Sequence, residues 1–126
     1  MIKIVIFDFD DTIVNNNKLD YQSFMVAFKH VNLPTPSLKK ITKLRKGGYL
    51  AKDIAHIYLK KNNKLSSLSN FLNFRKKFLN SKESILFLCL KKGTRALLHL
   101  LKNKNIKILL CSSTNNKNLV MCFLKK

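Results

Sequence analysis

The pattern of apolar and polar residues predicts two strands near the ends of the chain. An almost continuous apolar run from Ile2 to Phe7 is interrupted only by Lys3, and a second run extends from Ile106 to Cys111. Short apolar runs without alternation are typical of strands buried on both faces of a parallel sheet. We therefore predict two parallel strands that are covered on both sides.

Between these runs, apolar residues recur every three or four positions, which is the period of amphipathic helices. Four helices are predicted between residues 19 and 80, and Thr35 with Pro36 is expected to begin the second of them. No convincing strand interrupts this region, so we predict a compact helical insertion. The side chains expected to face inward include Tyr21, Phe24, Met25, Phe28, Val31, Leu50, Ile54, Ile57, Tyr58, Leu68, Phe71 and Leu72.

The segment after the insertion contains one ambiguous run and two further predicted helices. The run Ile85 to Leu90 fits either a buried helix or an extended connection. Gly93 then precedes a helix that ends near Asn103, and a last helix is predicted over residues 119–124. The inward residues of the helix after Gly93 are expected to be Ala96, Leu97, Leu100 and Leu101.

The order of strand, helical insertion, helix, strand and helix predicts an α/β fold. Its core would be partial, with parallel strands, and it would be formed by residues 1–16 and 82–126. Residues 17–81 would form the α-helical insertion directly after the first strand.

Acidic residues are concentrated where the first strand ends. Three of the six Asp and Glu residues, Asp8, Asp10 and Asp11, lie within four positions, and Thr12 follows them. Ligand sites in parallel sheets lie beyond the carboxyl ends of the strands. A polar turn that happens to be acidic is the alternative interpretation, but the position at a strand end favours a functional site.

Two carboxylates two residues apart can divide the work of phosphoryl transfer. Asp8 would attack phosphorus and carry an aspartyl phosphate, while Asp10 would protonate the leaving oxygen and later deprotonate water. Because anions repel a phosphate dianion, a divalent cation is expected between them, and Mg²⁺ suits oxygen ligands. The candidate phosphate-binding residues are Thr12, Ser112 and Ser113. Ser112 alone is equally explained as a helix N-cap or turn residue.

Two motifs resemble those of the haloacid dehalogenase (HAD) superfamily of phosphatases and phosphotransferases. FDFDDT, Phe7 to Thr12, resembles its first motif, DxDx[TV], and ILLCSSTN, Ile108 to Asn115, resembles its second, a strand ending in Ser or Thr. The insertion resembles the helical cap of the β-phosphoglucomutase and phosphoglycolate phosphatase branch. The resemblance implies a Rossmann-like core and a hydrolase that acts on a small phosphorylated metabolite.

The resemblance also implies a role for each residue of the two motifs. Asp8 would be the nucleophile, Asp10 the acid/base, and Ser112 a ligand of the phosphoryl oxygen. Mg²⁺ would be held by the Asp8 side chain and the Asp10 backbone carbonyl. An Asp at position 10 argues against dehalogenation, since dehalogenases of the superfamily lack this second Asp.

A basic segment in the insertion is a candidate for contact with the substrate. In the β-phosphoglucomutase and phosphoglycolate phosphatase branch, a cap loop reaches over the active site. The residues of this chain that fall where such a loop could lie are Arg45, Lys46 and Gly47. A basic side chain there could contact a remote anionic group of the substrate. A solvated, basic helix end is the alternative interpretation.

The chain departs from the family pattern after its second motif. It ends 14 residues beyond Ser112, and no Asp or Glu follows Glu83, so a third-motif Lys and fourth-motif acids are not found. We therefore expect a C-terminally truncated member with an unpaired sheet edge and an uncovered apolar face. A second polypeptide or a homo-oligomer would complete the core. The alternative is a catalytically incomplete remnant that binds phosphate or a partner.

The composition changes this picture little. The formal net charge of +19 raises nucleic acid as a partner. However, the Lys residues are scattered and only three residues are Arg, which base-reading surfaces favour. We do not expect nucleic-acid binding to be the main role.

The cysteines and the apolar segments bear on the cellular location. Cys89, Cys111 and Cys122 show no metal-ligand spacing and are predicted to be reduced core residues of an intracellular protein. No apolar run reaches the roughly 18 residues that cross a bilayer, and the first run meets Asp8 too early for a signal peptide. A cytoplasmic location without membrane association is expected.

Overall fold

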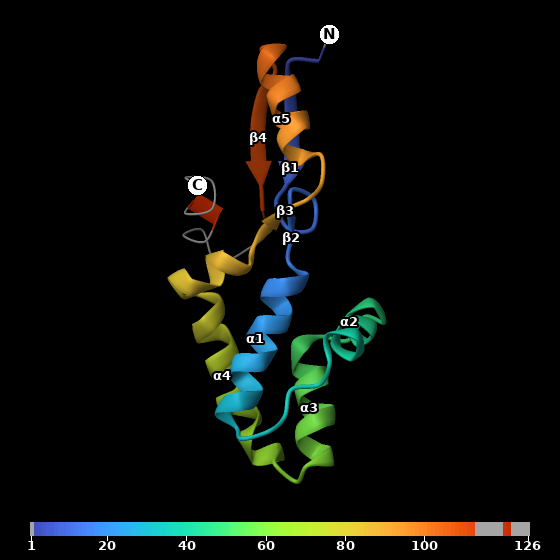
Figure 1. Ribbon diagram of the computed structural model, residues 1–126, viewed down its shortest axis with the longest axis vertical. Coiled ribbons are helices and arrows are strands. Elements are labelled where there is room, and N and C mark those ends of the chain that lie inside the picture. Colours follow the sequence, from blue (N-terminus) through green and yellow to red (C-terminus); the bar gives the residue numbers. More distant parts are fainter. Residues whose placement is uncertain (1, 113–119, 122–126) are drawn as a thin grey trace. The chain divides into compact units, whose positions relative to one another are not determined.

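The computed structural model describes residues 2–112 and 120–121, and divides the chain into two compact units (Figure 1). One unit consists of Met1–Lys18 with Ile85–Lys126, and the other of Leu19–Ser84. The first unit is mixed α/β, whereas the described residues of the second are helical. The predicted helix over 119–124 falls largely outside the described residues.

The first unit is built on a pair of parallel strands. β1 (Ile4–Asp8) pairs with β4 (Lys107–Cys111), and Asp8 stands opposite Cys111 in the register. Helix α5 (Thr94–Asn103) precedes β4 and lies beside it (Figure 1). The two predicted strands and their parallel direction are therefore confirmed.

A second, very short sheet connects the start and the end of the helical insertion. β2 (Val14–Asn15) pairs antiparallel with β3 (Cys89–Leu90). The ambiguous run before Leu90 is divided between a 3₁₀ helix, Lys82–Phe87, and strand β3.

The prediction that the strands are buried on both faces is wrong. Ile4 and Ile6 are 50% and 65% exposed, and Leu109 on β4 is 39% exposed, whereas Val5 and Phe7 on the other face are half-buried. Side chains alternate between the two faces of a strand. Helix α5 packs against β4, and the face that carries Ile4, Ile6 and Leu109 is left open. An uncovered apolar face is what a partial sheet was expected to leave.

Two cysteines are also more exposed than predicted. Cys89 and Cys111 are exposed free thiols, so their assignment to the core is wrong. Cys111 shares the open face of the strand pair with Leu109, and Cys89 lies on a sheet of two strands. Cys122 lies outside the described residues.

The buried stripe of α5 differs from the predicted one. Thr94 and Leu101 are buried and Leu98 is half-buried, whereas Leu97 and Leu100 are 42% and 52% exposed. Thr94, Leu98 and Leu101 are spaced by four and three residues, so they share one face of the helix. The closely spaced leucines of α5 give the helix more than one apolar face. The face that is buried is the one that also carries the polar Thr94.

Four helices form the second unit, as predicted: α1 (Asn17–His30), α2 (Leu38–Lys46), α3 (Ala51–Lys61) and α4 (Leu68–Leu79). α2 begins two residues later than the Thr35 and Pro36 signal indicated. The carbonyl of Ser37 accepts the first bonds of this helix, from the N–H groups of Lys40 and Ile41 at 3.0 and 3.1 Å. α2 ends before Gly48, whose φ of +86° favours glycine.

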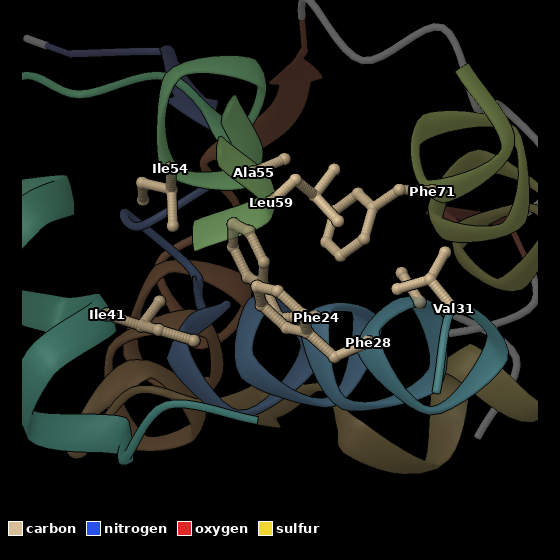
Figure 2. Close-up of a cluster of buried hydrophobic side chains, with 9 residues drawn as sticks. Phe24, Phe28, Val31, Ile41, Ile54, Ala55, Leu59 and Phe71 are labelled. Atoms are coloured by element: carbon tan, nitrogen blue, oxygen red, sulfur yellow. The ribbon is translucent and has the colours of Figure 1, made fainter. Parts of the chain in front are cut away.

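Aromatic rings from α1 and α4 form the centre of the helical unit (Figure 2). Phe28 and Phe71 meet edge to face with ring centroids 4.7 Å apart, and Phe24 lies 6.1 Å from Phe71. Such aromatic pairs add to the free energy gained from burial alone. The buried members of this core are Phe24, Ala27, Phe28, Val31, Ile41, Ile54, Ala55, Leu59 and Phe71.

Three residues predicted to face this core point outward instead. Met25, Leu50 and Ile57 are 37%, 66% and 42% exposed. In α3 the buried residues are Ile54, Ala55 and Leu59, so a small alanine occupies a place that the sequence pattern assigned to larger side chains.

None of the described helices has the length and apolarity needed to cross a membrane.

Candidate active site

The chain turns sharply after β1 and forms a loop that presents its acidic residues. Phe9, Ile13 and Val14 are buried, and the Phe9 carbonyl accepts hydrogen bonds from the N–H groups of Ile13 and Val14 at 3.1 and 3.2 Å. Asp11 has a φ of +56°, a left-handed conformation that Asp tolerates better than most residues. The buried residues fix a turn whose polar residues, including the exposed Thr12, remain accessible.

Asp8 and Ser112 lie at the same edge of the parallel pair. Asp8 is the last residue of β1, and Ser112 directly follows β4, whose last residue stands opposite Asp8. This is the carboxyl edge, where parallel sheets place their ligands. The Asp8 Oδ1 atom accepts a hydrogen bond from the Phe9 N–H at 2.9 Å, and Asp8 itself is exposed.

Asp10 connects the loop with the end of β4. The Ser112 hydroxyl donates to Asp10 Oδ2 at 3.3 Å, although these residues are 102 positions apart in the sequence. Asp8, Asp10 and Ser112 are therefore brought to one site, together with Thr12 in the intervening loop. Ser113, the other predicted phosphate ligand, lies outside the described residues.

Asn16 is a site residue that the sequence analysis missed. Its side-chain Nδ2 donates to Asp10 Oδ1 at 2.7 Å, so both oxygens of the Asp10 carboxylate accept a hydrogen bond. Its own Oδ1 is buried and has no partner among the described residues. A bridge between Asp10 and Val14 folds the chain back and brings Asn16 beside the acidic loop. In the sequence, Asn16 is one of three consecutive asparagines, a pattern that indicates only a loop.

Lys91, which follows the helical insertion in the sequence, also contacts this loop. Its backbone N–H donates to the Ile13 carbonyl at 2.9 Å, and its ammonium group donates to the Asp11 carbonyl. The Thr94 hydroxyl donates to the Ile13 carbonyl at 3.4 Å. The pairing of Val14 with Leu90 in the short sheet places Lys91 next to the loop.

The oxygen atoms of this loop suit a hard cation that takes few ligands from the protein. The Asp8 carboxylate and the Asp10 backbone carbonyl are oxygen ligands, which Mg²⁺ prefers, and Mg²⁺ commonly keeps several waters and binds substrate phosphate. Among the described residues, no three His, Cys, Asp or Glu side chains gather in a group that could hold a metal ion. The donors fit Mg²⁺ supplemented by water and phosphate, and they do not fit a closed structural metal site.

Arg45, from the basic segment Arg45 to Gly47, forms an ion pair within the helical unit. Arg45 Nε lies 2.9 Å from Asp20 Oδ2, Arg75 Nη2 lies 2.5 Å from Asp20 Oδ1, and Arg75 also stacks over the Phe24 ring. Burial lowers the pKa of Arg75, and the Asp20 carboxylate acts in the opposite direction. One carboxylate thus joins guanidinium groups from α2 and α4. Contact of Arg45 with a substrate stays a prediction, as it does for the exposed Lys46 and Gly47.

We expect Asp20→Asn to lower the free energy of unfolding by about 2 kcal/mol, between the values for exposed and fully buried ion pairs. The substitution leaves two neighbouring guanidinium groups without their anion. Urea denaturation followed by circular dichroism measures the change. Glu83→Gln removes an equal charge at an exposed position and should change the unfolding free energy little. Equal effects of the two substitutions would contradict a specific role for Asp20.

Two of the three comparisons with known proteins found matches. A family model described as haloacid dehalogenase-like hydrolase matches residues 5–126. A hydrolase of the HAD superfamily, subfamily IA, from Geobacter sulfurreducens has a similar structure, with a TM-score of 0.77 at 14% identity over 98% of this chain and 58% of its own. No curated protein matches the sequence.

Two further solved structures show the same likeness. A haloacid dehalogenase-like hydrolase from Streptococcus pneumoniae has a TM-score of 0.69 at 18% identity, over 98% of this chain and 56% of its own. A protein described as a predicted phosphoglycolate phosphatase, from Haemophilus somnus, has a TM-score of 0.68 at 19% identity, over 97% of this chain and 57% of its own. At these identities the likeness shows the fold alone. The chain spans little more than half the length of these structures.

Proposed function

Since the chain belongs to the haloacid dehalogenase-like hydrolase family, we propose that it carries the reacting carboxylates of a Mg²⁺-dependent phosphatase for a small phosphorylated metabolite. The observation that carries this proposal is the meeting of Asp8, Asp10 and Ser112 at the carboxyl edge of the β1–β4 pair. The description of the Haemophilus somnus structure as a phosphatase supports the same class of substrate.

The two carboxylates perform successive steps of the proposed reaction. An oxygen of Asp8 forms a bond to phosphorus while the bond from phosphorus to the ester oxygen breaks, and Asp10 donates a proton to that oxygen. Asp10 then removes a proton from a water molecule, which attacks phosphorus and releases inorganic phosphate from Asp8. The Ser112 hydroxyl donates to a non-reacting phosphoryl oxygen.

The Asp8 carboxylate and the Asp10 backbone carbonyl would hold Mg²⁺, as their oxygen chemistry allows. When bound there, the ion would supply positive charge between the carboxylates and the phosphate. Asp10 can reach two reacting oxygens in turn only if its carboxylate keeps its orientation. The hydrogen bond from Asn16 restricts that orientation, including when substrate is bound and the Ser112 hydroxyl donates to the phosphoryl oxygen in place of Asp10.

We expect Asn16→Ala to lower kcat by about 10- to 100-fold, the range that corresponds to one hydrogen bond to a charged group. The substitution removes the donor that orients Asp10 but leaves both carboxylates in place. Steady-state hydrolysis of an aryl phosphate measures kcat. Asn17→Ala is the matched control, because Asn17 is exposed at the start of α1. A kcat that is the same in both variants would contradict the positioning role.

The proposed function is tested by hydrolysis of a generic aryl phosphate by the purified chain. Turnover should be present with Mg²⁺ and should disappear when a chelator removes the ion. Turnover that is unaffected by the chelator would contradict the metal requirement. No turnover by a protein that circular dichroism shows to be folded would contradict phosphatase activity of this chain.

We further propose that the open face of the β1–β4 pair is covered in the working enzyme by a second polypeptide or by a second copy of the chain. Ile4, Ile6 and Leu109 leave an apolar surface on this face, and buried apolar surface is what stabilises such contacts. The molar mass of the purified chain in solution, measured by light scattering, distinguishes a second copy from a different polypeptide. A dimer of the purified chain that dissociates on Ile6→Lys supports a second copy, and a monomer excludes it.

A further inference from the structure

The acidic loop concentrates negative charge that no described ion pair neutralises. The described ion pairs of the chain both involve Asp20, and neither includes Asp8, Asp10 or Asp11. A phosphate dianion that approaches these carboxylates is repelled unless positive charge is close by. The proposed Mg²⁺ supplies part of that charge, and the chain itself should supply more.

Lys91 is held at this loop by two independent contacts. Its backbone is fixed by the bond from its N–H to the Ile13 carbonyl, at 2.9 Å, beside the pairing of Val14 with Leu90. Its side chain extends to the loop as well, where the ammonium group donates to the Asp11 carbonyl. Asp11 directly follows Asp10, so the carbonyl that accepts this bond belongs to the residue next to the proposed acid/base in the sequence.

The ammonium group retains the capacity to bind an anion. It has three N–H donors, and the Asp11 carbonyl accepts from it. Lys91 is exposed, so the other donors can meet solvent or a ligand. A lysine that only anchored the loop would use one N–H donor, for the bond to the Asp11 carbonyl. A lysine beside a phosphoryl site can also donate charge-assisted hydrogen bonds to the phosphate with its remaining N–H groups.

We propose that Lys91 is a substrate-contacting residue of this site, whose ammonium group donates to a phosphoryl oxygen and supplies positive charge beside Asp8 and Asp10. The inference rests on the proposed function, and it assigns a binding role to a residue that follows the helical insertion. In this arrangement the segment after β3 and the loop after β1 close around the phosphate together.

The test is the affinity of the 126-residue chain for inorganic phosphate, measured by titration calorimetry in the presence of Mg²⁺. Lys91→Met should raise the Kd by about tenfold or more, as expected when a charge-assisted hydrogen bond is lost. Lys92→Met is the matched control, because Lys92 is adjacent, exposed and equal in charge. Lys91→Arg keeps a cation and should restore most of the affinity.

Three results would overturn the inference. Equal Kd values for Lys91→Met and Lys92→Met would assign the effect to the overall charge of the protein. A lower denaturation midpoint for Lys91→Met with an unchanged Kd would reduce Lys91 to an anchor of the loop. A wild-type chain that binds no phosphate would remove the site altogether.

Failure of this inference is distinguishable from failure of the proposed function. Phosphate binding that depends on Lys91, in a wild-type chain without aryl phosphatase turnover, would overturn the phosphatase proposal alone. Turnover with kcat/KM and phosphate Kd both unaffected by Lys91→Met would overturn the role of Lys91 alone.

Discussion

Asp8→Asn is expected to lower kcat for hydrolysis of an aryl phosphate by at least about 10⁴-fold, because it removes the nucleophile and leaves the other groups of the site in place. An amide of the same shape keeps the hydrogen bond from the Phe9 N–H to the side-chain oxygen. The fold should therefore be unchanged, which circular dichroism can verify. Steady-state kinetics with Mg²⁺ measure the loss.

Two further substitutions in the same loop separate loss of the nucleophile from loss of the acid/base and from loss of charge alone. Asp10→Asn removes the acid/base and should cost about 10²- to 10⁴-fold in kcat, the usual contribution of such a group. Asp11→Asn removes an equal charge from an exposed neighbour whose side chain has no place in the reaction, so it should retain most of the activity. If Asp8→Asn retained as much activity as Asp11→Asn, Asp8 would not be the nucleophile.

Phe28→Ala is expected to lower the free energy of unfolding by about 3–5 kcal/mol, the range for removing a large aromatic side chain from a core. Phe28 is fully buried and points into the core beside Phe71 (Figure 2). Its ring centroid lies 4.7 Å from that of Phe71 and 5.9 Å from that of Tyr58. The helical unit would lose contacts to α3 and α4 at once. Circular dichroism in urea is the suitable measurement, since the chain has no Trp.

Met25→Ala is the matched control for this substitution, since Met25 lies on the same helix but is 37% exposed. Its effect should remain within about 0.5 kcal/mol, as for other surface positions. Phe28→Leu should fall between the two, because it keeps part of the buried volume. Comparable losses for Phe28→Ala and Met25→Ala would contradict the central place of Phe28 in the core.

The sequence was sufficient to predict the parallel strands β1 and β4, the four helices of the insertion and helix α5. Apolar runs that end in Asp8 and in Ser112 identify two parallel strands with a site at their carboxyl edge, because side-chain chemistry and strand direction are both local properties. The four helices of the insertion follow from a local period in the same way. Their first residues were less certain, as the shift of the start of α2 from Pro36 to Leu38 shows.

Which face of an element is buried depends on what packs against it, and the sequence pattern did not determine this. The apolar strand Ile4–Asp8 exposes Ile4 and Ile6 on one face, whereas Val5 and Phe7 on the other are half-buried. Ile57 and Leu97 satisfied a helical period and are nevertheless exposed. An apolar run shows that a side chain can be buried, and it leaves open whether a partner covers it.

Long-range polar contacts were beyond prediction for a related reason. Lys91 meets the Asp11 carbonyl across 80 positions, and Arg45 meets Asp20 across 25. Lysines are scattered over the whole chain, so nothing in the sequence distinguishes Lys91 from Lys92 before the short sheet places it. Asn16 is similarly hidden within a run of asparagines, although the turn at Phe9 brings its amide to Asp10.

Covalent transfer of the phosphoryl group to Asp8 is tested most directly by mass spectrometry of the acid-quenched reaction. The Asp10→Asn variant should accumulate the intermediate, since it lacks the base that activates water. One added phosphoryl group is expected on the peptide that contains Asp8, labile to hydroxylamine, with Mg²⁺ and an aryl phosphate present. Turnover by the wild-type chain with no phosphoryl group on that peptide in either protein would show that Asp8 is not the nucleophile.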